Sequence, residues 1–268
     1  MANKDADREL WVEFNGTLDR ILAMNGSVNL FMFHGGTSFG FLNGANVLPV
    51  FPNYAATISS YDYDAPVSEA GDYTAKYWAL RGLLAAYQRD LPVATPPSPP
   101  PTQRVAYDTV ALDQHLTLDD LADRLGYSIR SDDVLAMEDL PINEGNGQSY
   151  GFILYRHEAV LSRGRHSIKT SGHVRDMAVL VVDGERVTDR FHSLTQLVDF
   201  GYWPLADRST DFNVSTTEVH RVDLLVENTG RNNYGPPSYF DQKKGLVDGP
   251  VLVDGEPLTG WQVPPSSS

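Results

Sequence analysis

The sequence contains no cysteine. This absence excludes disulfides, thiolate nucleophiles and cysteine-ligated zinc. Secretion stays open, because a chain of 268 residues can bury a core without covalent cross-links. The sequence also has no run of 18 apolar residues, which excludes a transmembrane helix.

Basic residues are scarce as well. The chain has 21 lysines and arginines against 35 aspartates and glutamates, for a net charge of −14. Nucleic acid and anionic membranes carry the same sign of charge, so the chain is a poor candidate for binding either. The charge suits neutral partners such as sugars and suits acidic compartments, although solubility alone explains it equally well.

The first eight residues are polar and do not form a signal peptide. Two explanations stay open. Either the protein is cytosolic, or the chain does not begin where the mature protein begins.

The first ninety residues predict a helix, a buried strand, a long loop and a second helix. Apolar residues recur at helical spacing over residues 9–24 and again over residues 72–87. Residues 28–33 are a short apolar and aromatic run, which is typical of a strand buried on both faces. This order of elements is that of a parallel α/β fold.

The pattern changes after residues 91–101, where six prolines favour a stiff extended spacer and mark a domain boundary. Beyond them, one short helix is predicted over residues 118–125, and short strands separated by turns make up the rest. The clearest strands cover residues 152–155, 177–182 and 222–226, and Asp-Gly pairs at 248–249 and 254–255 bracket another short strand at residues 251–253. Asp183-Gly184 predicts a hairpin turn with a return strand at residues 186–187. The pattern predicts a β-sandwich or jelly roll.

The loop that follows residues 28–33 is the best candidate site, because function in parallel α/β folds gathers at the carboxyl ends of strands. It combines polar groups with aromatic faces, as sugar recognition requires. The candidates are His34, Gly35, Gly36, Thr37, Asn43, Asn46, Tyr61, Asp62, Tyr63 and Asp64. Composition alone favours an ordinary loop that satisfies its own backbone.

Catalytic groups are not evident in this loop. Asp64 and Glu69 are expected to hydrogen-bond the loop backbone or to cap the next helix. His34 has no carboxylate at metal-ligand spacing, so a hydrogen-bonded histidine without catalytic role is favoured. The sequence has no His-Glu-x-x-His, no Gly-x-Ser-x-Gly and no phosphate or dinucleotide loop. No metal site and no cofactor are therefore expected.

A second polar loop, residues 227–235, follows a predicted strand. It could contact sugar or a neighbouring domain. A self-bonded turn in which Glu227 pairs with Arg231 is the favoured alternative.

Five runs, taken together, give a more specific signal. They cover residues 28–40, 43–46, 60–71, 150–156 and 225–235, and the third contains Ser60-Tyr61-Asp62-Tyr63-Asp64-Ala65-Pro66. In sequence and in order they resemble glycoside hydrolase family 35, the acid β-galactosidases. The resemblance extends over about 230 residues, and chance does not give five such runs in succession.

The resemblance implies a multi-domain protein with α/β and all-β parts. Residues 1–90 would be the C-terminal end of a (β/α)₈ TIM barrel, with helix 7, strand 8 and helix 8. Residues 91–103 would be a proline-rich linker, and residues 104–265 a jelly-roll or β-sandwich domain. The family's retaining hydrolysis uses two glutamates. Both would lie outside this chain, so no catalytic residue is assigned and Glu9 and Glu13 are rejected as substitutes.

The resemblance also implies contacts with a β-galactoside substrate, either a small molecule or a glycan. Tyr63 matches a tyrosine that lines the family's galactose site, and Phe31 stands where related enzymes often have a tyrosine. Asn43 and Asn46 would order the loop or lie at the rim of the site.

Two functions are carried forward from the sequence. One is a partial chain of a retaining β-galactosidase that is inactive alone, and the other is a non-catalytic carbohydrate-binding or interaction module. The family implies a lysosomal or extracellular location, and the oligomeric state is left open.

Overall fold

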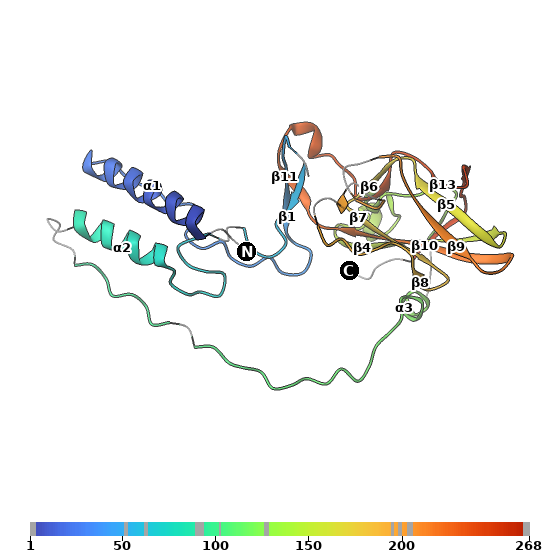
Figure 1. The fold of residues 1–268 in the computed structure, drawn as a ribbon, viewed down its shortest axis with the longest axis horizontal. Coiled ribbons are helices and arrows are strands. Elements are labelled where there is room, and N and C mark those ends of the chain that lie inside the picture. Colours follow the sequence, from blue (N-terminus) through green and yellow to red (C-terminus); the bar gives the residue numbers. More distant parts are fainter. Residues whose placement is uncertain are drawn as a thin grey trace. The chain divides into compact units, whose positions relative to one another are not determined.

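The computed structural model describes residues 4–50, 53–61, 64–88, 94–101, 103–125, 129–193, 196–197, 200–202 and 206–264. The chain divides into two compact units (Figure 1). The first contains Met1–Ser38 and Ser59–Val110, and the second contains Phe39–Ile58 and Ala111–Ser268.

The first unit is built on two helices, α1 (Lys4–Ala23) and α2 (Ala75–Tyr87), which confirms both predicted helices. Helix α2 begins a few residues later than predicted, because Thr74 is its N-cap and accepts the Lys76 amide at 3.2 Å. The Tyr87 hydroxyl donates to Asp19 Oδ1 at 2.6 Å and so joins the two helices.

The predicted strand at residues 28–33 is wrong, because this segment joins no sheet of the described residues. Among the described residues, its strand-like contacts are the Val67 amide donating to the Phe33 carbonyl at 3.1 Å and an isolated bridge between the adjacent His34 and Val67. A strand requires a neighbour along its whole length to satisfy its backbone groups. The side chain of Phe31 is 80% exposed, so the predicted burial on both faces is absent too.

The proline-rich segment lies beside α2. The Tyr73 hydroxyl donates to the Pro99 carbonyl at 2.8 Å, and the Tyr77 hydroxyl lies 3.1 Å from Ser98 Oγ. Residues 94–101 and 103–116 have no helix or strand, as the prolines predict.

The second unit is a two-sheet sandwich. Its six-stranded sheet has the order β3-β15-β4-β10-β7-β8, and its four-stranded sheet has the order β14-β13-β5-β9. The strands of the first sheet are β3 (Ile129–Ser131), β15 (Trp261–Val263), β4 (Gly151–Leu161), β10 (Glu218–Asn228), β7 (Met177–Val182) and β8 (Glu185–Arg186). Those of the second are β14 (Glu256–Pro257), β13 (Val251–Val253), β5 (Gly164–Thr170) and β9 (Arg208–Val214). Strands β12 (Gly245–Val247) and β6 (His173–Arg175) pair separately.

One hydrophobic core joins the two sheets. Ile153 and Leu224 enter it from the six-stranded sheet, and Ile168, Phe212 and Val253 enter it from the four-stranded sheet. Each of these side chains is at most 5% exposed, which makes their burial the main stabilising contribution. Short 3₁₀ turns lie at Met137–Asp139, Asn143–Gly145 and Pro237–Tyr239.

The hairpin turn predicted from Asp183-Gly184 is confirmed. Asp183 and Gly184 have φ of 50° and 85°, and they connect β7 to β8 with Val182 opposite Glu185. Positive φ at both central residues is the requirement of a type I′ hairpin, which Asp-Gly satisfies with little strain.

The predicted short helix is α3 (Leu118–Arg124), with Thr117 and Asp120 forming a capping box. Asp119 on this helix lies 2.6 Å from Arg156 and also pairs with Arg221. Both arginines reach Asp223, which is 1% exposed. An ion network thus holds α3 to the six-stranded sheet.

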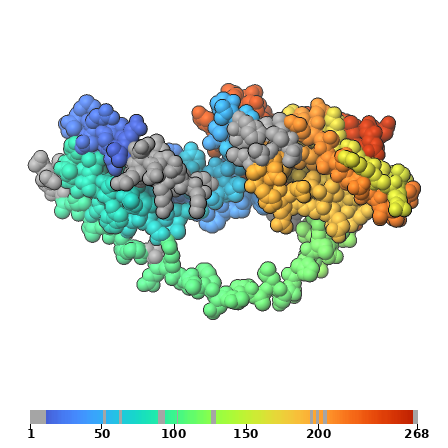
Figure 2. Space-filling view, in the orientation of Figure 1, coloured from blue at the N-terminus to red at the C-terminus, as the bar shows by residue number. Residues whose placement is uncertain are grey.

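A further sheet of three strands brings the loop after residue 38 into the second unit. Strand β1 (Gly44–Val47) pairs antiparallel with β2 (Tyr54–Ala56) and parallel with β11 (Arg231–Tyr234). Figure 2 shows the blue atoms of β1 against the orange-red atoms that follow β11. Strands β1 and β2 thus precede the domain boundary expected at residues 91–103, but they form a sheet with β11, which follows it. No helix among the described residues has both the length and the apolar character needed to cross a bilayer.

Candidate functional site

The residues predicted to bind substrate fall into both units. Phe31 belongs to the first unit, and its ring makes an edge contact with Tyr61 at a centroid distance of 5.9 Å. Asn43 and Asn46 belong to the second unit. Tyr63 lies outside the described residues, so its assignment stays a prediction.

Asn43 connects the two polar segments of the second unit. Its amide Nδ2 donates to the Thr229 carbonyl at 2.6 Å and to the Gly44 carbonyl at 3.2 Å. These bonds use both hydrogens of the amide, so the side chain orders the loop. Asn46 is half-buried in β1, opposite Ala55 on β2 and Tyr234 on β11.

The described part of the 60–71 motif is held by polar contacts. Asp64 lies 2.6 Å from Lys76 on α2, and His34 Nε2 lies 3.3 Å from the Glu69 carbonyl. The Asp64 carboxylate thus pairs with a lysine of the next helix, and Glu69 contributes its backbone carbonyl and not its side chain. Because Thr74 caps α2, the prediction that Asp64 or Glu69 caps this helix is wrong, whereas the His34 contact agrees with a hydrogen-bonded histidine.

A buried ion pair, which we term the Asp176–Lys244 centre, lies at the junction of β6, β12 and the loop between β10 and β11. Lys244 Nζ is 2.7 Å from Asp176 Oδ1 and 2.8 Å from Oδ2. It also donates to the Gly230 carbonyl at 2.8 Å. Asp176 and Lys244 are 0% and 1% exposed, so each charge depends on the other for its neutralisation.

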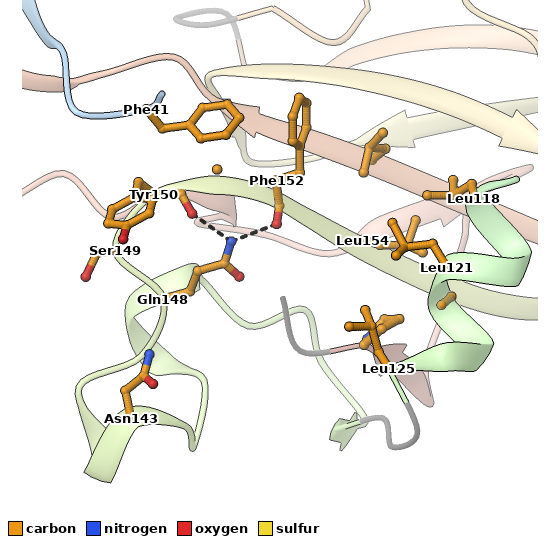
Figure 3. Close-up of a pocket in the computed structure, with 14 residues that line it drawn as sticks. Phe41, Leu118, Leu121, Leu125, Asn143, Gln148, Ser149, Tyr150, Phe152 and Leu154 are labelled. Carbon is orange, nitrogen blue, oxygen red and sulfur yellow. Dashed lines mark hydrogen bonds between the residues drawn. The ribbon is translucent and has the colours of Figure 1, made fainter. Parts of the chain in front are cut away.

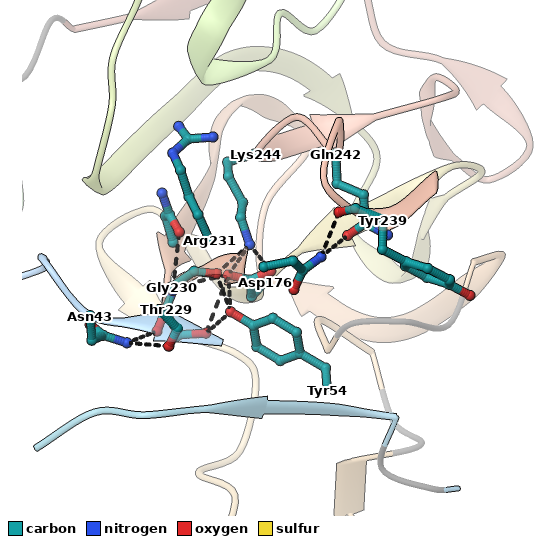
Figure 4. Close-up of polar contacts among 12 residues, drawn as sticks. Asn43, Tyr54, Asp176, Thr229, Gly230, Arg231, Tyr239, Gln242 and Lys244 are labelled. Atoms are coloured by element: carbon teal, nitrogen blue, oxygen red, sulfur yellow. Dashed lines mark hydrogen bonds and ion pairs between the residues drawn. The ribbon is translucent and has the colours of Figure 1, made fainter. Parts of the chain in front are cut away.

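The hydroxyl of Tyr54 joins the loop of residues 39–58 to this centre (Figure 4). Its hydroxyl lies 2.9 Å from Asp176 Oδ2 and 3.1 Å from Thr229 Oγ1. The Thr229 amide also donates to Asp176 Oδ2, at 2.9 Å. The Asp176 carboxylate therefore contacts Tyr54, Thr229 and Lys244, which belong to three segments that are separate in the sequence.

Burial determines the protonation of this centre. Burial, with the Asp176 charge adding to it, raises the pKa of the Tyr54 hydroxyl far above its usual range, so the hydroxyl keeps its proton. Burial lowers the pKa of Lys244, and the adjacent carboxylate of Asp176 counteracts that effect. A buried ion pair with hydrogen bonds of this kind positions chain segments.

No pattern in the sequence singles out Tyr54, Asp176 or Lys244. The two charged residues stand 68 positions apart and neither belongs to a motif. A lysine next to the short apolar run Gly245-Leu246-Val247 was the only local signal of its burial.

The predicted pairing of Glu227 with Arg231 is wrong. Arg231 instead pairs with Glu138 at 2.5 Å and donates to the Ser149 carbonyl at 2.8 and 3.0 Å. Gly230, at φ 145°, separates β10 from β11, so the two side chains belong to different strands. Burial, followed by the nearby Asp176 charge, raises the pKa of Glu227.

An apolar hollow of about 330 Å³ lies between α3 and β4 (Figure 3). Leu118, Leu121, Phe152 and Leu154 contribute to its walls. Gln148 lies beside it, with its amide donating to the Phe152 carbonyl at 2.7 Å. Its lining contains no carboxylate and few groups able to direct sugar hydroxyls, so it is a poor monosaccharide site. Within the described residues, no group of three or more histidine, aspartate or glutamate side chains could hold a metal ion.

Both parts of the chain match known protein families. Residues 4–87 match the family described as Glycosyl hydrolases family 35, and residues 142–267 match the family described as Beta-galactosidase, first all-beta domain.

Individual relatives match over nearly the whole chain. Human Beta-galactosidase-1-like protein 2 is 37% identical over 248 residues, covering 92% of this chain and 35% of the relative. Beta-galactosidase 1 of Dictyostelium discoideum is 34% identical, covering 91% and 36% respectively. Human Beta-galactosidase is 36% identical, covering 91% and 32%. The chain thus spans about a third of the length of these relatives. The chain belongs to glycosyl hydrolases family 35, and its residues 142–267 are a first all-beta domain of the β-galactosidase type.

Proposed function

We propose that this chain contributes one wall of the galactose site of a retaining β-galactosidase, which removes terminal β-linked galactose from glycoconjugates. The match of residues 4–87 to glycosyl hydrolases family 35 carries this proposal. The names of the relatives, which are β-galactosidases or β-galactosidase-like proteins, support it.

In this proposal Tyr63 contacts the sugar directly, and Phe31 presents an aromatic face without the hydroxyl of a tyrosine. The 80% exposure of Phe31 supports a role in contact with a ligand. Asn46 lies at the rim of the site, and Asn43 orders the loop through Thr229. Calorimetric titration of galactose into the chain tests this assignment. Tyr63→Ala should abolish the heat of binding, whereas Tyr150→Ala, a change in the other unit, should preserve it.

The two catalytic glutamates lie outside residues 1–268 in this proposal. Retaining hydrolysis requires a nucleophile and an acid/base whose carboxyl groups are about 5–5.5 Å apart. Incubation of the purified 268-residue chain with an aryl β-galactoside should therefore release no phenol above the blank. Human β-galactosidase in the same assay is the positive control. Turnover by this chain would show that a catalytic pair lies within it.

We further propose that residues 1–90 are the last part of a TIM barrel, that residues 91–103 are a linker, and that residues 104–265 are a jelly-roll domain. The α1 and α2 helices and the exposed apolar segment at residues 28–33 support the first part. Rapid amide exchange over residues 28–33 is expected, because the barrel strands that would pair with it are absent from the described residues. Strong protection there would contradict the assignment.

A non-catalytic carbohydrate-binding module is the second candidate. The observation in its favour is that the second unit has a hydrophobic core of its own, shared between two sheets. Titration with galactose or lactose separates the two candidates. Binding that survives Tyr63→Ala would favour the module, and no heat at millimolar sugar would count against it.

A lysosomal or extracellular location completes the proposal. It rests on the family resemblance and on the net charge of −14, which suits an acidic medium. Fractionation of cells that express a tagged chain tests it, and a purely cytosolic distribution would count against it.

A further inference from the structure

Two histidines of the second unit are held in the same way. His166 on β5 is 6% exposed, and its Nδ1 lies 2.6 Å from Oδ2 of Asp254 in the turn between β13 and β14. Its Nε2 lies 2.7 Å from the Ser162 carbonyl. The other oxygen of Asp254 accepts the Ser167 amide at 2.9 Å, and the Asp254 amide donates to the Ser167 carbonyl at 2.9 Å.

His220 on β10 repeats each of these contacts. It is 3% exposed, and its Nδ1 lies 2.6 Å from Oδ2 of Asp183 in the turn between β7 and β8. Its Nε2 lies 3.2 Å from the Thr216 carbonyl, again four residues before the histidine. Asp183 Oδ1 accepts the Arg221 amide at 2.8 Å, and the Asp183 amide donates to the Arg221 carbonyl at 2.9 Å. We term the two arrangements the histidine–aspartate clamps.

The partners of each ring define its protonation state. A carboxylate and a backbone carbonyl are acceptors only, so both ring nitrogens must donate for both contacts to be hydrogen bonds. A neutral imidazole has one N–H and leaves the other nitrogen facing an acceptor lone pair. Only the imidazolium form satisfies either clamp, and in each clamp it lies against an aspartate charge of opposite sign.

The remaining charges near the clamps do not reverse this preference. Around His166 stand Asp211 of β9, which pairs with Arg165, and the ring of Phe212 at 5.6 Å. Around His220 stand Glu218 of the same strand, which favours the charged ring, and Ala159 on the facing β4.

The Arg221 guanidinium is directed to Asp119 and Asp223, so its charge is already paired. Hydrogen bonding to the aspartates is the main cause that raises the pKa of both histidines, while their mutual repulsion opposes it at His166.

We propose that the two histidine–aspartate clamps stabilise the sandwich in a pH-dependent manner. Both hydrogen bonds of each ring form when His166 and His220 are protonated, and the stabilisation weakens when the rings lose their protons. Each clamp joins a hairpin turn to a strand, so its strength contributes to the stability of the whole second unit.

The pH range of the clamps follows from the signs of the shifts. Raised histidine pKa values contribute stability that is complete below about 6.5, the unfolded value, and is lost as pH rises through the folded pKa. Burial opposes the shift at Asp183, but the hydrogen bonds from His220 and the Arg221 amide outweigh it and lower the pKa. The Ser167 amide and then His166 lower the pKa of Asp254. Their contribution is present above about 3.9 and is lost as pH falls through the lowered pKa. The clamps are thus strongest in mildly acidic solution.

Proton NMR of the full chain tests the protonation directly. The ring resonances of His166 and His220, assigned with the single variants His166→Gln and His220→Gln, should titrate with midpoints above about 6.5. Midpoints at or below that value for both rings would overturn the proposal. The midpoints are read on the wild-type chain, and the variants serve only to assign the two ring resonances.

Thermal unfolding at pH 6 and pH 8 tests the consequence. The unfolding midpoint should be higher at pH 6, and the double variant His166→Gln/His220→Gln should lose most of that difference. His173→Gln is the matched control, since His173 lies 3.3 Å from Asp248 but its side chain is 33% exposed. The control should keep the difference. An undiminished difference in the double variant would overturn the proposal.

Discussion

Lys244 Nζ lies 2.7 Å from Asp176 Oδ1 in the second unit, and neither side chain is more than 1% exposed. The adjacent Lys243 also pairs with an aspartate, Asp139, at 2.6 Å, but its side chain is 52% exposed. Two successive lysines thus make ion pairs in opposite environments. Removing one partner of a buried pair leaves a charge that water cannot reach, whereas exposed pairs contribute little.

Lys244→Met should destabilise the second unit by about 3–5 kcal/mol, because it leaves the Asp176 carboxylate buried and uncompensated. Urea denaturation measures the free energy of unfolding. Lys243→Met is the control and should change it little. Adding Asp176→Asn to Lys244→Met should restore part of the loss, and equal losses for the two lysine variants would contradict the structure.

Tyr54→Phe should weaken the attachment of residues 39–58 to the sandwich. The ring is retained, but Asp176 loses a hydroxyl donor at 2.9 Å, which costs about 1.5–3 kcal/mol for a hydrogen bond to a charged group. Amide exchange over residues 44–47 should accelerate, because β1 is held on one side by β2, which carries Tyr54. Tyr234→Phe, at a tyrosine that is 66% exposed, should leave both stability and exchange unchanged.

Local signals in the sequence predicted the local structure well. Asp183-Gly184 encodes its turn within two residues, and the capped helices α2 and α3 lie within a few residues of the predicted spans. The prediction of a strand at residues 28–33 is wrong because a strand forms only beside hydrogen-bonded neighbouring strands. The local sequence does not indicate whether such neighbours are present.

The site was less predictable than the fold. Asn43 was expected at a polar loop, but its partner Thr229 is 186 residues away, and the Asp176–Lys244 pair spans 68 residues. Hydrogen bonds between segments so far apart leave no periodicity in one sequence. The family resemblance supplied Tyr63, which composition alone could not distinguish from other loop tyrosines.

Asp119→Asn should loosen α3 from the six-stranded sheet. Asp119 pairs with Arg156 and Arg221, and removing its charge leaves both arginines with Asp223 alone. Because the Asp119 side chain is 36% exposed, solvent screening limits the expected loss to about 1 kcal/mol.

Amide exchange over residues 118–124 measures the docking of α3. The wild-type chain in high salt should resemble the variant in low salt, since added ions screen the same charges. Asp123→Asn removes an exposed charge of the same helix and should not change the exchange. An equal effect of the two variants would mean that general helix electrostatics, and not the ion network, controls α3.

Gly245→Ala should be among the most damaging single substitutions in the second unit. Gly245 has φ of 99°, and an added Cβ would overlap the Tyr155 hydroxyl. That hydroxyl cannot move away easily, because it donates to the Leu135 carbonyl at 2.6 Å and accepts the Leu246 amide at 3.0 Å. Backbone strain of about 1–2 kcal/mol and overpacking of about 1–3 kcal/mol therefore combine.

Gly255→Ala separates the backbone strain of Gly245→Ala from its steric overlap with Tyr155. Gly255 also has a positive φ, 89°, but no atom lies within 4 Å of an added Cβ. It should lose only the backbone contribution, about 1–2 kcal/mol. Urea denaturation of both variants gives the difference, which measures the steric contribution of Tyr155. Tyr155→Phe removes the overlapping oxygen but also its two hydrogen bonds, so it serves as the reference background. Gly245→Ala should cost less in the Tyr155→Phe background than in the wild-type chain, and an equal cost would place the strain elsewhere around Gly245.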